Sequence, residues 1–186
     1  MKSVCVFCGS SPGNHPRYLE VARDLGRLLA ERRCTLVYGG GRVGLMGAVA
    51  DAVLQAGGRA VGVIPQLLLD KEVGHTGLSE LHVVQTMAQR KQLMGDLSDA
   101  FLTLPGGIGT MDELFEAWTW TQLDLHRKPC GLLNQDGYYD SLVAFIDHCQ
   151  SEGFLRPRHA AALIVETDLS RLFDRLGAAA GQAENQ

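Results

Sequence analysis

The chain has 186 residues, 46% of them apolar, and a formal net charge of −4. This length fits one domain with a full hydrophobic core, and the acidic balance disfavours nucleic acid as a partner, because nucleic-acid binding usually leaves a basic footprint. The longest apolar runs are too short to cross a bilayer and the N-terminus lacks a signal peptide, so we expect a cytoplasmic protein without a membrane partner.

Short apolar runs alternate with helical patterns along the chain. The first helical stripe, for example, carries Tyr18, Ala22 and Leu25 on one face. In chain order the predicted elements are a strand at 3–7, a helix at 18–32, a strand at 35–38, a helix at 44–56, a strand at 60–65, an irregular connection at 66–80, a strand at 81–84, a helix at 87–97, a strand at 100–104, a helix at 110–123, a strand at 129–134, a helix at 138–152, a strand at 162–165 and a helix at 168–176.

Strands that are apolar throughout and are followed by helices predict a parallel sheet covered on both faces. The expected fold is α/β, a three-layer, doubly wound, Rossmann-like sheet in which ligands bind beyond the carboxyl ends of the strands. Residues 1–178 are expected to form one nucleotide-binding domain, and residues 179–186 a flexible tail.

The five cysteines make a poor disulfide framework, which agrees with a reducing compartment. Cys5 and Cys8 are three positions apart on a predicted strand, so their side chains should face opposite sides of the sheet. We interpret both as buried small apolar residues. The histidines are scattered, and we predict no metal site.

Three glycine-rich loops directly follow predicted strands, at residues 8–11, 38–47 and 105–110. Glycine lets the backbone approach a ligand closely, and the N–H groups at the start of the next helix favour a phosphate. The spacing of Gly39, Gly41 and Gly44 matches the dinucleotide fingerprint, but no carboxylate follows the next strand, which disfavours NAD. There is no P-loop motif either, so a nucleotide or sugar phosphate bound in another way is the better interpretation.

Charged residues follow two of these strands. Arg90 and Lys91 occupy the first turns of the helix at 87–97, where cations oppose the helix dipole and would be better tolerated beside an anionic ligand. Glu113 follows Thr110 by three residues, which is also the spacing of a capping box. The residues alone leave open whether Glu113 caps the helix or faces a substrate.

The segment "PGGIGTMDE" (residues 105–113) resembles the PGGxGTxxE signature of the LOG (Lonely Guy) family of cytokinin riboside 5′-monophosphate phosphoribohydrolases. That family long carried the label "possible lysine decarboxylase". The resemblance runs over nearly the whole chain, through "VCVFCGSS", "LVYGGGRVGLMG", "GVIPQLLLDKEVGH", "TMAQRK" and "KPCGLLNQDGYYDSL". One position departs from it, because the family often has His where this chain has Ala88.

The resemblance implies hydrolysis of the N-glycosidic bond of a nucleoside 5′-monophosphate, with Arg90 and Glu113 as the catalytic pair and neither metal nor organic cofactor. It also implies a homodimer. Trp118 and Trp120 lie about 200° apart on the helix, so one of them is expected to contact a partner or the base. The substrate-binding residues that the resemblance implies are Gly9, Ser10, Gly40, Gly41, Met87, Lys91, Gly106, Gly107, Gly109 and Thr110.

Two other functions compete with this one. Glycine loops would serve a non-catalytic nucleotide sensor or carrier equally well. A decarboxylase would need a lysine that forms a Schiff base with pyridoxal phosphate, and Lys91 is the lysine nearest to the expected site. The preference between AMP and isoprenoid-modified AMP is not predicted by the sequence.

Overall fold

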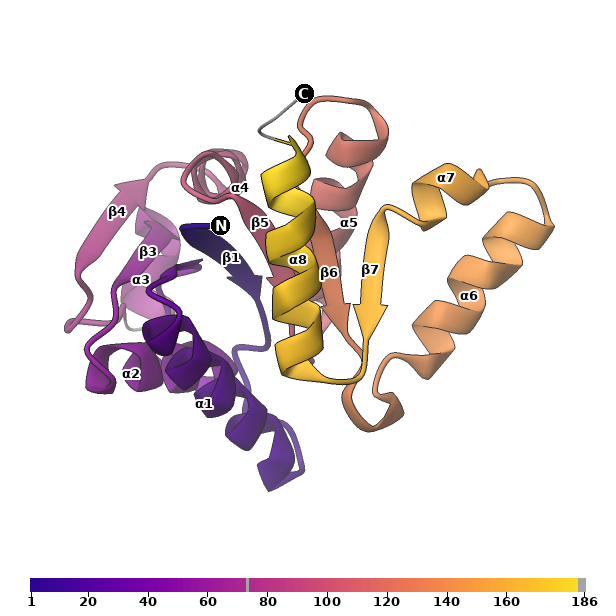
Figure 1. The fold of residues 1–186 in the computed structure, drawn as a ribbon. Coiled ribbons are helices and arrows are strands. Elements are labelled where there is room, and N and C mark those ends of the chain that lie inside the picture. Colours follow the sequence, from indigo (N-terminus) through magenta and orange to yellow (C-terminus); the bar gives the residue numbers. More distant parts are fainter. Residues whose placement is uncertain (73, 184–186) are drawn as a thin grey trace.

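The computed structural model describes every residue except 73 and 184–186. It contains seven strands in its described part, each close to a predicted one (Figure 1). The strands are β1 (Ser3–Phe7), β2 (Thr35–Tyr38), β3 (Ala60–Pro65), β4 (Glu80–Val84), β5 (Ala100–Thr103), β6 (Cys130–Leu133) and β7 (Leu163–Glu166). The helices are α1 (Pro16–Glu31), α2 (Gly44–Gln55), α3 (Gln66–Glu72), α4 (Met87–Asp96), α5 (Ile108–Gln122), α6 (Asp140–Ser151), α7 (Pro157–Ala160) and α8 (Leu169–Ala183), with a 3₁₀ turn at Gln135–Gly137.

All seven strands are parallel, in the order β4-β3-β2-β1-β5-β6-β7. The chain builds the sheet outward from β1 in one direction, and then returns to add β5 on the other side of β1. This reversal confirms the predicted doubly wound fold and puts the topological switch point between β1 and β5, where such folds bind their ligands. Within the described residues, no helix is long and apolar enough to span a membrane.

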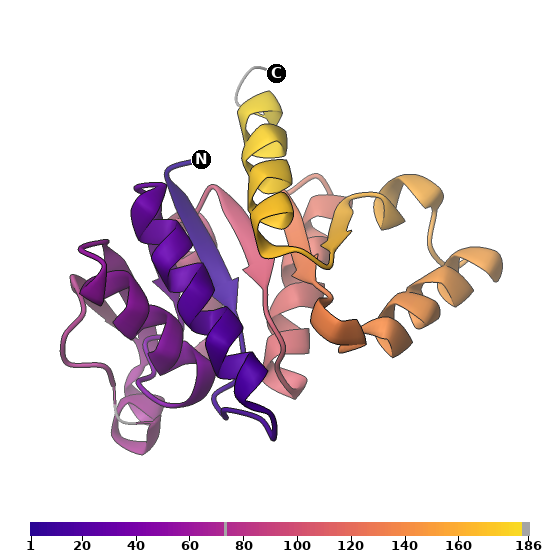
Figure 2. The same ribbon diagram turned by 60° about the horizontal axis from the view of Figure 1, so that its bottom comes forward.

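Helices cover both faces of the sheet, which gives the predicted three layers (Figures 1 and 2). One core lies beneath α1, α2 and α8, and contains Leu25, Val49 and Leu172. The other lies beneath α4, α5 and α6, and contains Met94, Leu114 and Ile146. Alternate residues of β1, β2 and β5 point into the two cores, so both faces of these central strands are buried.

Helices α3 and α7 were not predicted, and the last helix is longer than predicted. Residues 66–72, expected to be irregular, form α3 directly after β3, because Pro65 ends the strand and is compatible with the first turn of a following helix. The last helix continues to Ala183, beyond the predicted end at residue 176. Residues 179–183 of the predicted flexible tail are therefore helical, and Ala180 is buried.

The cysteines are free thiols, and Cys5 and Cys8 lie in different cores, as their spacing predicted. Burial raises the pKa of Cys5 and Cys8 well above the ordinary value, and raises the pKa of Cys34 and Cys130 to about 12. Thiolate is the reactive form, so these four should react slowly at pH 8.

We expect Ellman's reagent to titrate one thiol, the half-buried Cys149, rapidly in the native protein and five in guanidinium; rapid reaction of several native thiols would contradict this packing.

Candidate active site

A cavity of about 220 Å³ lies at the carboxyl edge of the sheet, between the loop after β1 and the start of α5. This is the switch point at which the topology predicts a ligand. Eight of the residues predicted to bind or react with substrate line it: Gly9, Ser10, Met87, Arg90, Gly107, Gly109, Thr110 and Glu113. The sequence prediction did not include Cys8, Met46, Ile108 and Asp112, which also line it.

The start of α5 faces the cavity. The helix begins at Ile108 with Gly107 as its N-cap, two residues earlier than predicted. The first N–H groups of a helix have no partner within it, and its dipole attracts an anion. Added Cβ atoms at Gly107 and Gly109 would meet open space, whereas one at Gly106 would lie 2.1 Å from Thr110 Oγ1. The loop is thus open on the side where a phosphate would bind.

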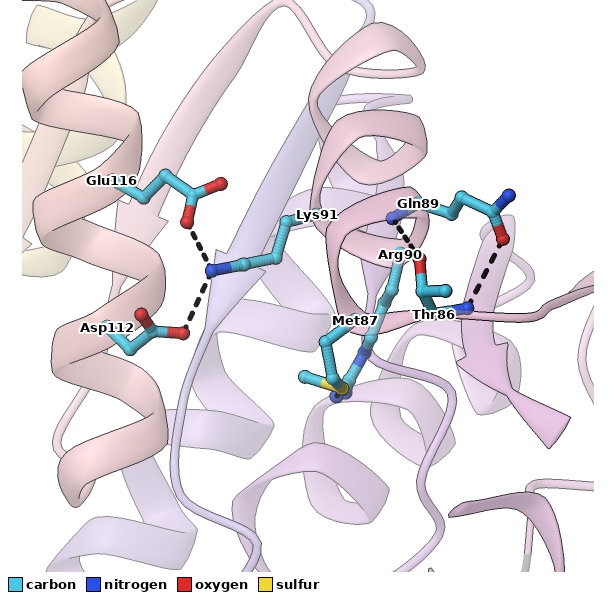
Figure 3. A network of polar contacts seen from close by, with 7 residues as sticks. All are labelled: Thr86, Met87, Gln89, Arg90, Lys91, Asp112 and Glu116. Atoms are coloured by element: carbon cyan, nitrogen blue, oxygen red, sulfur yellow. Dashed lines mark hydrogen bonds and ion pairs between the residues drawn. The ribbon is translucent and has the colours of Figure 1, made fainter. Parts of the chain in front are cut away.

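The earlier start of α5 excludes the capping box that Thr110 and Glu113 suggested. Thr110 is the third helical residue and is buried, and the N-cap residue is a glycine without a side chain. The structure has its capping box on α4 instead, where Thr86 Oγ1 accepts from the Gln89 N–H and the Gln89 side chain accepts from the Thr86 N–H (Figure 3). This box fixes the first turn of α4, which carries Met87 and Arg90.

Arg90 places a buried cation at the cavity, with 6% of the residue exposed. Its Nη2 donates to the Gly39 carbonyl at 3.1 Å, and its Nη1 lies 3.8 Å from the Met87 sulfur. Neither partner is negatively charged, and Nε has no hydrogen-bond partner among the described residues. Because a buried charge is costly unless it is paired, this guanidinium is well suited to an anionic or polar ligand.

Gly39 explains how the second glycine loop serves the site. A Cβ at this position would lie 1.8 Å from Arg90 Nη2, so a glycine is what allows the guanidinium to reach the carbonyl. Gly40 and Gly41, predicted to bind substrate, do not line the cavity. Gly40 adopts φ +75°, its carbonyl accepts from the His75 N–H at 3.0 Å, and Gly41 forms an isolated bridge with Gly74.

Glu113 lines the cavity from the second turn of α5, half-buried, on the same cavity as Arg90. Burial is the largest cause of the raised pKa of Cys5 and Cys8, and the negative charge of Glu113 is the next largest. The positive charge of Arg90 lowers the pKa of Cys5. Both charges therefore act on the end of β1. A carboxylate and a guanidinium cation line the same cavity.

Lys91 is oriented differently from its neighbour Arg90, and it does not line the cavity. Its Nζ lies 3.1 Å from Asp112 Oδ2 and also pairs with Glu116, so it joins α4 to α5 (Figure 3). The described contacts of Lys91 are thus with two carboxylates, and its contact with substrate stays a prediction.

The first glycine loop is held by backbone contacts. The Gly9 N–H donates to the Pro105 carbonyl at 3.1 Å, and the Gly9 carbonyl accepts from the Leu45 N–H at 3.0 Å. Gly9 therefore shapes the cavity wall without offering its amide. Gly106 lines a neighbouring recess of about 150 Å³, where its carbonyl accepts from Tyr138 Oη at 2.8 Å.

Gly44 holds α2 against this loop, and its replacement tests the packing. A Cβ at Gly44, at φ +63°, would lie 2.3 Å from the Ser10 carbonyl carbon. Gly57 is a matched control, because its φ is +77° but a Cβ there meets open space. We expect Gly57→Ala to cost about 1 kcal/mol for the left-handed conformation, and Gly44→Ala about 3 kcal/mol because the clash adds to it. Equal decreases in the melting temperatures of the Gly44→Ala and Gly57→Ala variants would contradict this.

The two tryptophans of α5 have different surroundings, as their spacing predicted. Trp118 is buried and its indole N–H donates to the His159 carbonyl at 2.8 Å. Trp120 is half-buried and lines a groove along α4 together with Ala88. The position at which the family often has His therefore lies on this groove and not on the cavity.

Known proteins are similar in sequence to this chain over most of its length. A sequence model described as "possible lysine decarboxylase" matches residues 46–176. A cytokinin riboside 5′-monophosphate phosphoribohydrolase of Rhodococcoides fascians is 51% identical over 90% of this chain and 85% of that protein. One of Arabidopsis thaliana is 49% identical over 94% of this chain and 81% of that protein. The chain belongs to the LOG family.

Solved structures agree with the fold of this LOG-family chain. The Moco carrier protein of Chlamydomonas reinhardtii superposes with a TM-score of 0.71 at 18% identity, over 97% of this chain and 98% of that one. A molybdenum cofactor binding protein of Rippkaea orientalis gives a TM-score of 0.70 at 21% identity, over 96% and 97%. At these identities the likeness concerns the fold alone.

Proposed function

We propose that the protein hydrolyses the N-glycosidic bond of a nucleoside 5′-monophosphate, releasing the free base and ribose 5-phosphate. The observation that carries this proposal is the buried Arg90 guanidinium, with an unpartnered Nε, on the same cavity as Glu113 and the open start of α5. A cation, a carboxylate and an open helix N-terminus around one space suit a phosphorylated ribose that develops positive charge as its glycosidic bond breaks. The names of the similar enzymes support the same activity.

The phosphate is assigned to the start of α5. The N–H groups near Gly107 and Gly109 and the Thr110 hydroxyl are the donors there, and the helix dipole favours a dianion. With the phosphate at this end, the ribose lies toward Arg90 and Glu113. Arg90 then holds the sugar phosphate by charge-assisted hydrogen bonds that fix its position relative to the carboxylate.

Glu113 acts on the anomeric carbon. Breaking the N-glycosidic bond develops positive charge on the ribose, as in other glycosidic cleavages, and a nearby carboxylate stabilises that charge. The same carboxylate orients a water molecule and takes up its proton as the oxygen bonds to the anomeric carbon. The departing base takes one proton from solvent, and Glu113 returns the proton of the water molecule to solvent, so the products are the neutral base and ribose 5-phosphate.

The competing functions are less well supported. A decarboxylase would need a lysine amine free to form a Schiff base, but Lys91 is paired with two carboxylates and lies outside the cavity. A sensor or carrier would have no need of a carboxylate beside the buried cation. Colourless protein without a visible absorbance band would agree with the hydrolase.

Substrate choice is tested by comparing kcat/KM for AMP and for isopentenyladenosine monophosphate. Similar enzymes are named for cytokinin riboside monophosphates, and we propose that the isoprenoid substrate is preferred. A higher kcat/KM for AMP would instead assign the enzyme to purine turnover. Adenosine, which lacks the phosphate, should be a poor substrate in either case.

We also propose a cytoplasmic homodimer. Large apolar side chains are exposed on the single chain, among them Ile108 at 91%, Phe154 at 89% and Phe145 at 57%. Exposed apolar surface of this kind is typical of association sites. Sedimentation analysis should give about twice the mass of one chain.

A further inference from the structure

Lys91 is a nearly buried cation between two helices of the site. Its side chain is 15% exposed and contacts Asp112, 55% exposed, and Glu116, 28% exposed (Figure 3). Burial lowers the pKa of Lys91, but the hydrogen bonds with Glu116 and Asp112 more than offset this, so the pKa is raised above its ordinary value. The amine is therefore charged whenever the protein is at neutral pH.

The two carboxylates lie where an anionic ligand would be repelled. Asp112 lines the same cavity as the start of α5, and Glu116 follows one turn later. With Glu113, the first three turns of α5 carry three acidic side chains; Asp112 and Glu113 line the cavity, and Glu116 lines the groove along α4. Their repulsion would oppose the attraction of the helix terminus, because charges a few ångströms apart interact strongly near a protein surface.

We propose that Lys91 is a positioning residue that offsets part of the negative charge of Asp112 and Glu116, so that a phosphate dianion can bind at the start of α5 beside Glu113. Lys91 does not touch the substrate in this role. Its charge weakens the repulsion between the two carboxylates and the ligand, and its contacts hold the carboxylates away from the ligand. The inference rests on the proposed function, because that function supplies the phosphate.

The test separates charge compensation from bridging by a set of variants. Lys91→Met should raise KM for AMP and weaken ribose 5-phosphate binding, each by about tenfold, while kcat changes less than twofold. Lys91→Arg, which keeps the charge, should bind nearly as well as the wild type. The triple variant with Lys91→Met, Asp112→Asn and Glu116→Gln, which removes all three charges, should bind ribose 5-phosphate at least as well as the wild type.

A purely structural bridge would give a different result. The triple variant lacks the bridge, so it would bind as weakly as Lys91→Met, and that outcome would overturn the proposal, as would an unchanged affinity in Lys91→Met. If Lys91→Met does not fold, Lys91→Gln takes its place. Binding is measured by calorimetry with ribose 5-phosphate and needs no turnover, whereas failure of the proposed function would appear as absence of base release by the wild type.

Discussion

Glu113→Gln is expected to lower kcat for base release by about 10²–10⁴-fold, with little change in KM. The amide keeps the size of the side chain, but it neither carries the charge that stabilises the developing ribose cation nor accepts the proton of the attacking water. Since Glu113 lines the cavity and the N-cap of α5 is Gly107, the loss should be in chemistry and not in folding. Steady-state kinetics with AMP, together with a thermal melt, measure both.

Asp112→Asn is the matched control for this variant. Asp112 precedes Glu113 on α5 and also lines the cavity, but its carboxylate pairs with Lys91. We expect the control to retain kcat within a few-fold. If Glu113→Gln keeps wild-type activity, or if both variants lose activity equally, Glu113 is not the group that acts on the ribose.

Arg90→Met is expected to have the second large effect. It should lower activity without lowering stability. We expect kcat/KM to fall by about 10²–10³-fold, because the cation that holds the sugar phosphate is lost. The free energy of unfolding should stay the same or rise, since replacing a buried, poorly paired charge by an apolar side chain is often neutral or stabilising. Arg90→Lys should recover little activity, because the planar fork is lost.

Gly39→Ala tests the same guanidinium without removing it. The added Cβ would occupy the position of Arg90 Nη2, so the side chain must move away from the Gly39 carbonyl. Activity should fall as it does for the Arg90 variants. A strong loss of stability in Arg90→Met, or an active Gly39→Ala, would contradict the account of a guanidinium held for its ligand.

The fold could be predicted because it depends on local patterns that repeat. Apolar strands followed by amphipathic helices allow few arrangements other than a doubly wound parallel sheet. The failures are the two short helices α3 and α7 and the ends of α5 and α8. Helix α3 follows β3 without a loop, and α5 begins at Ile108, where a glycine cap gives a weaker sequence signal than the Thr110–Glu113 spacing.

The candidate site could be predicted as a location, but not in the direction of every side chain. Sequence patterns placed Arg90 and Lys91 together at the carboxyl edge, yet adjacent helical residues point about 100° apart, and only Arg90 reaches the cavity. In the second loop, Gly39 acts through the position of Arg90 and not through contact with the cavity. Those roles depend on contacts between helices that are distant in the sequence, which periodicity does not encode.

Cleavage of an N-glycosidic bond in the Arg90–Glu113 cavity can be measured through the products formed from AMP. Purified protein is incubated with AMP and the mixture is separated by chromatography. We predict adenine and ribose 5-phosphate in equal amounts from the wild type and almost none from Glu113→Gln. Adenosine with inorganic phosphate, or AMP recovered intact from a protein that binds it, would contradict the claim.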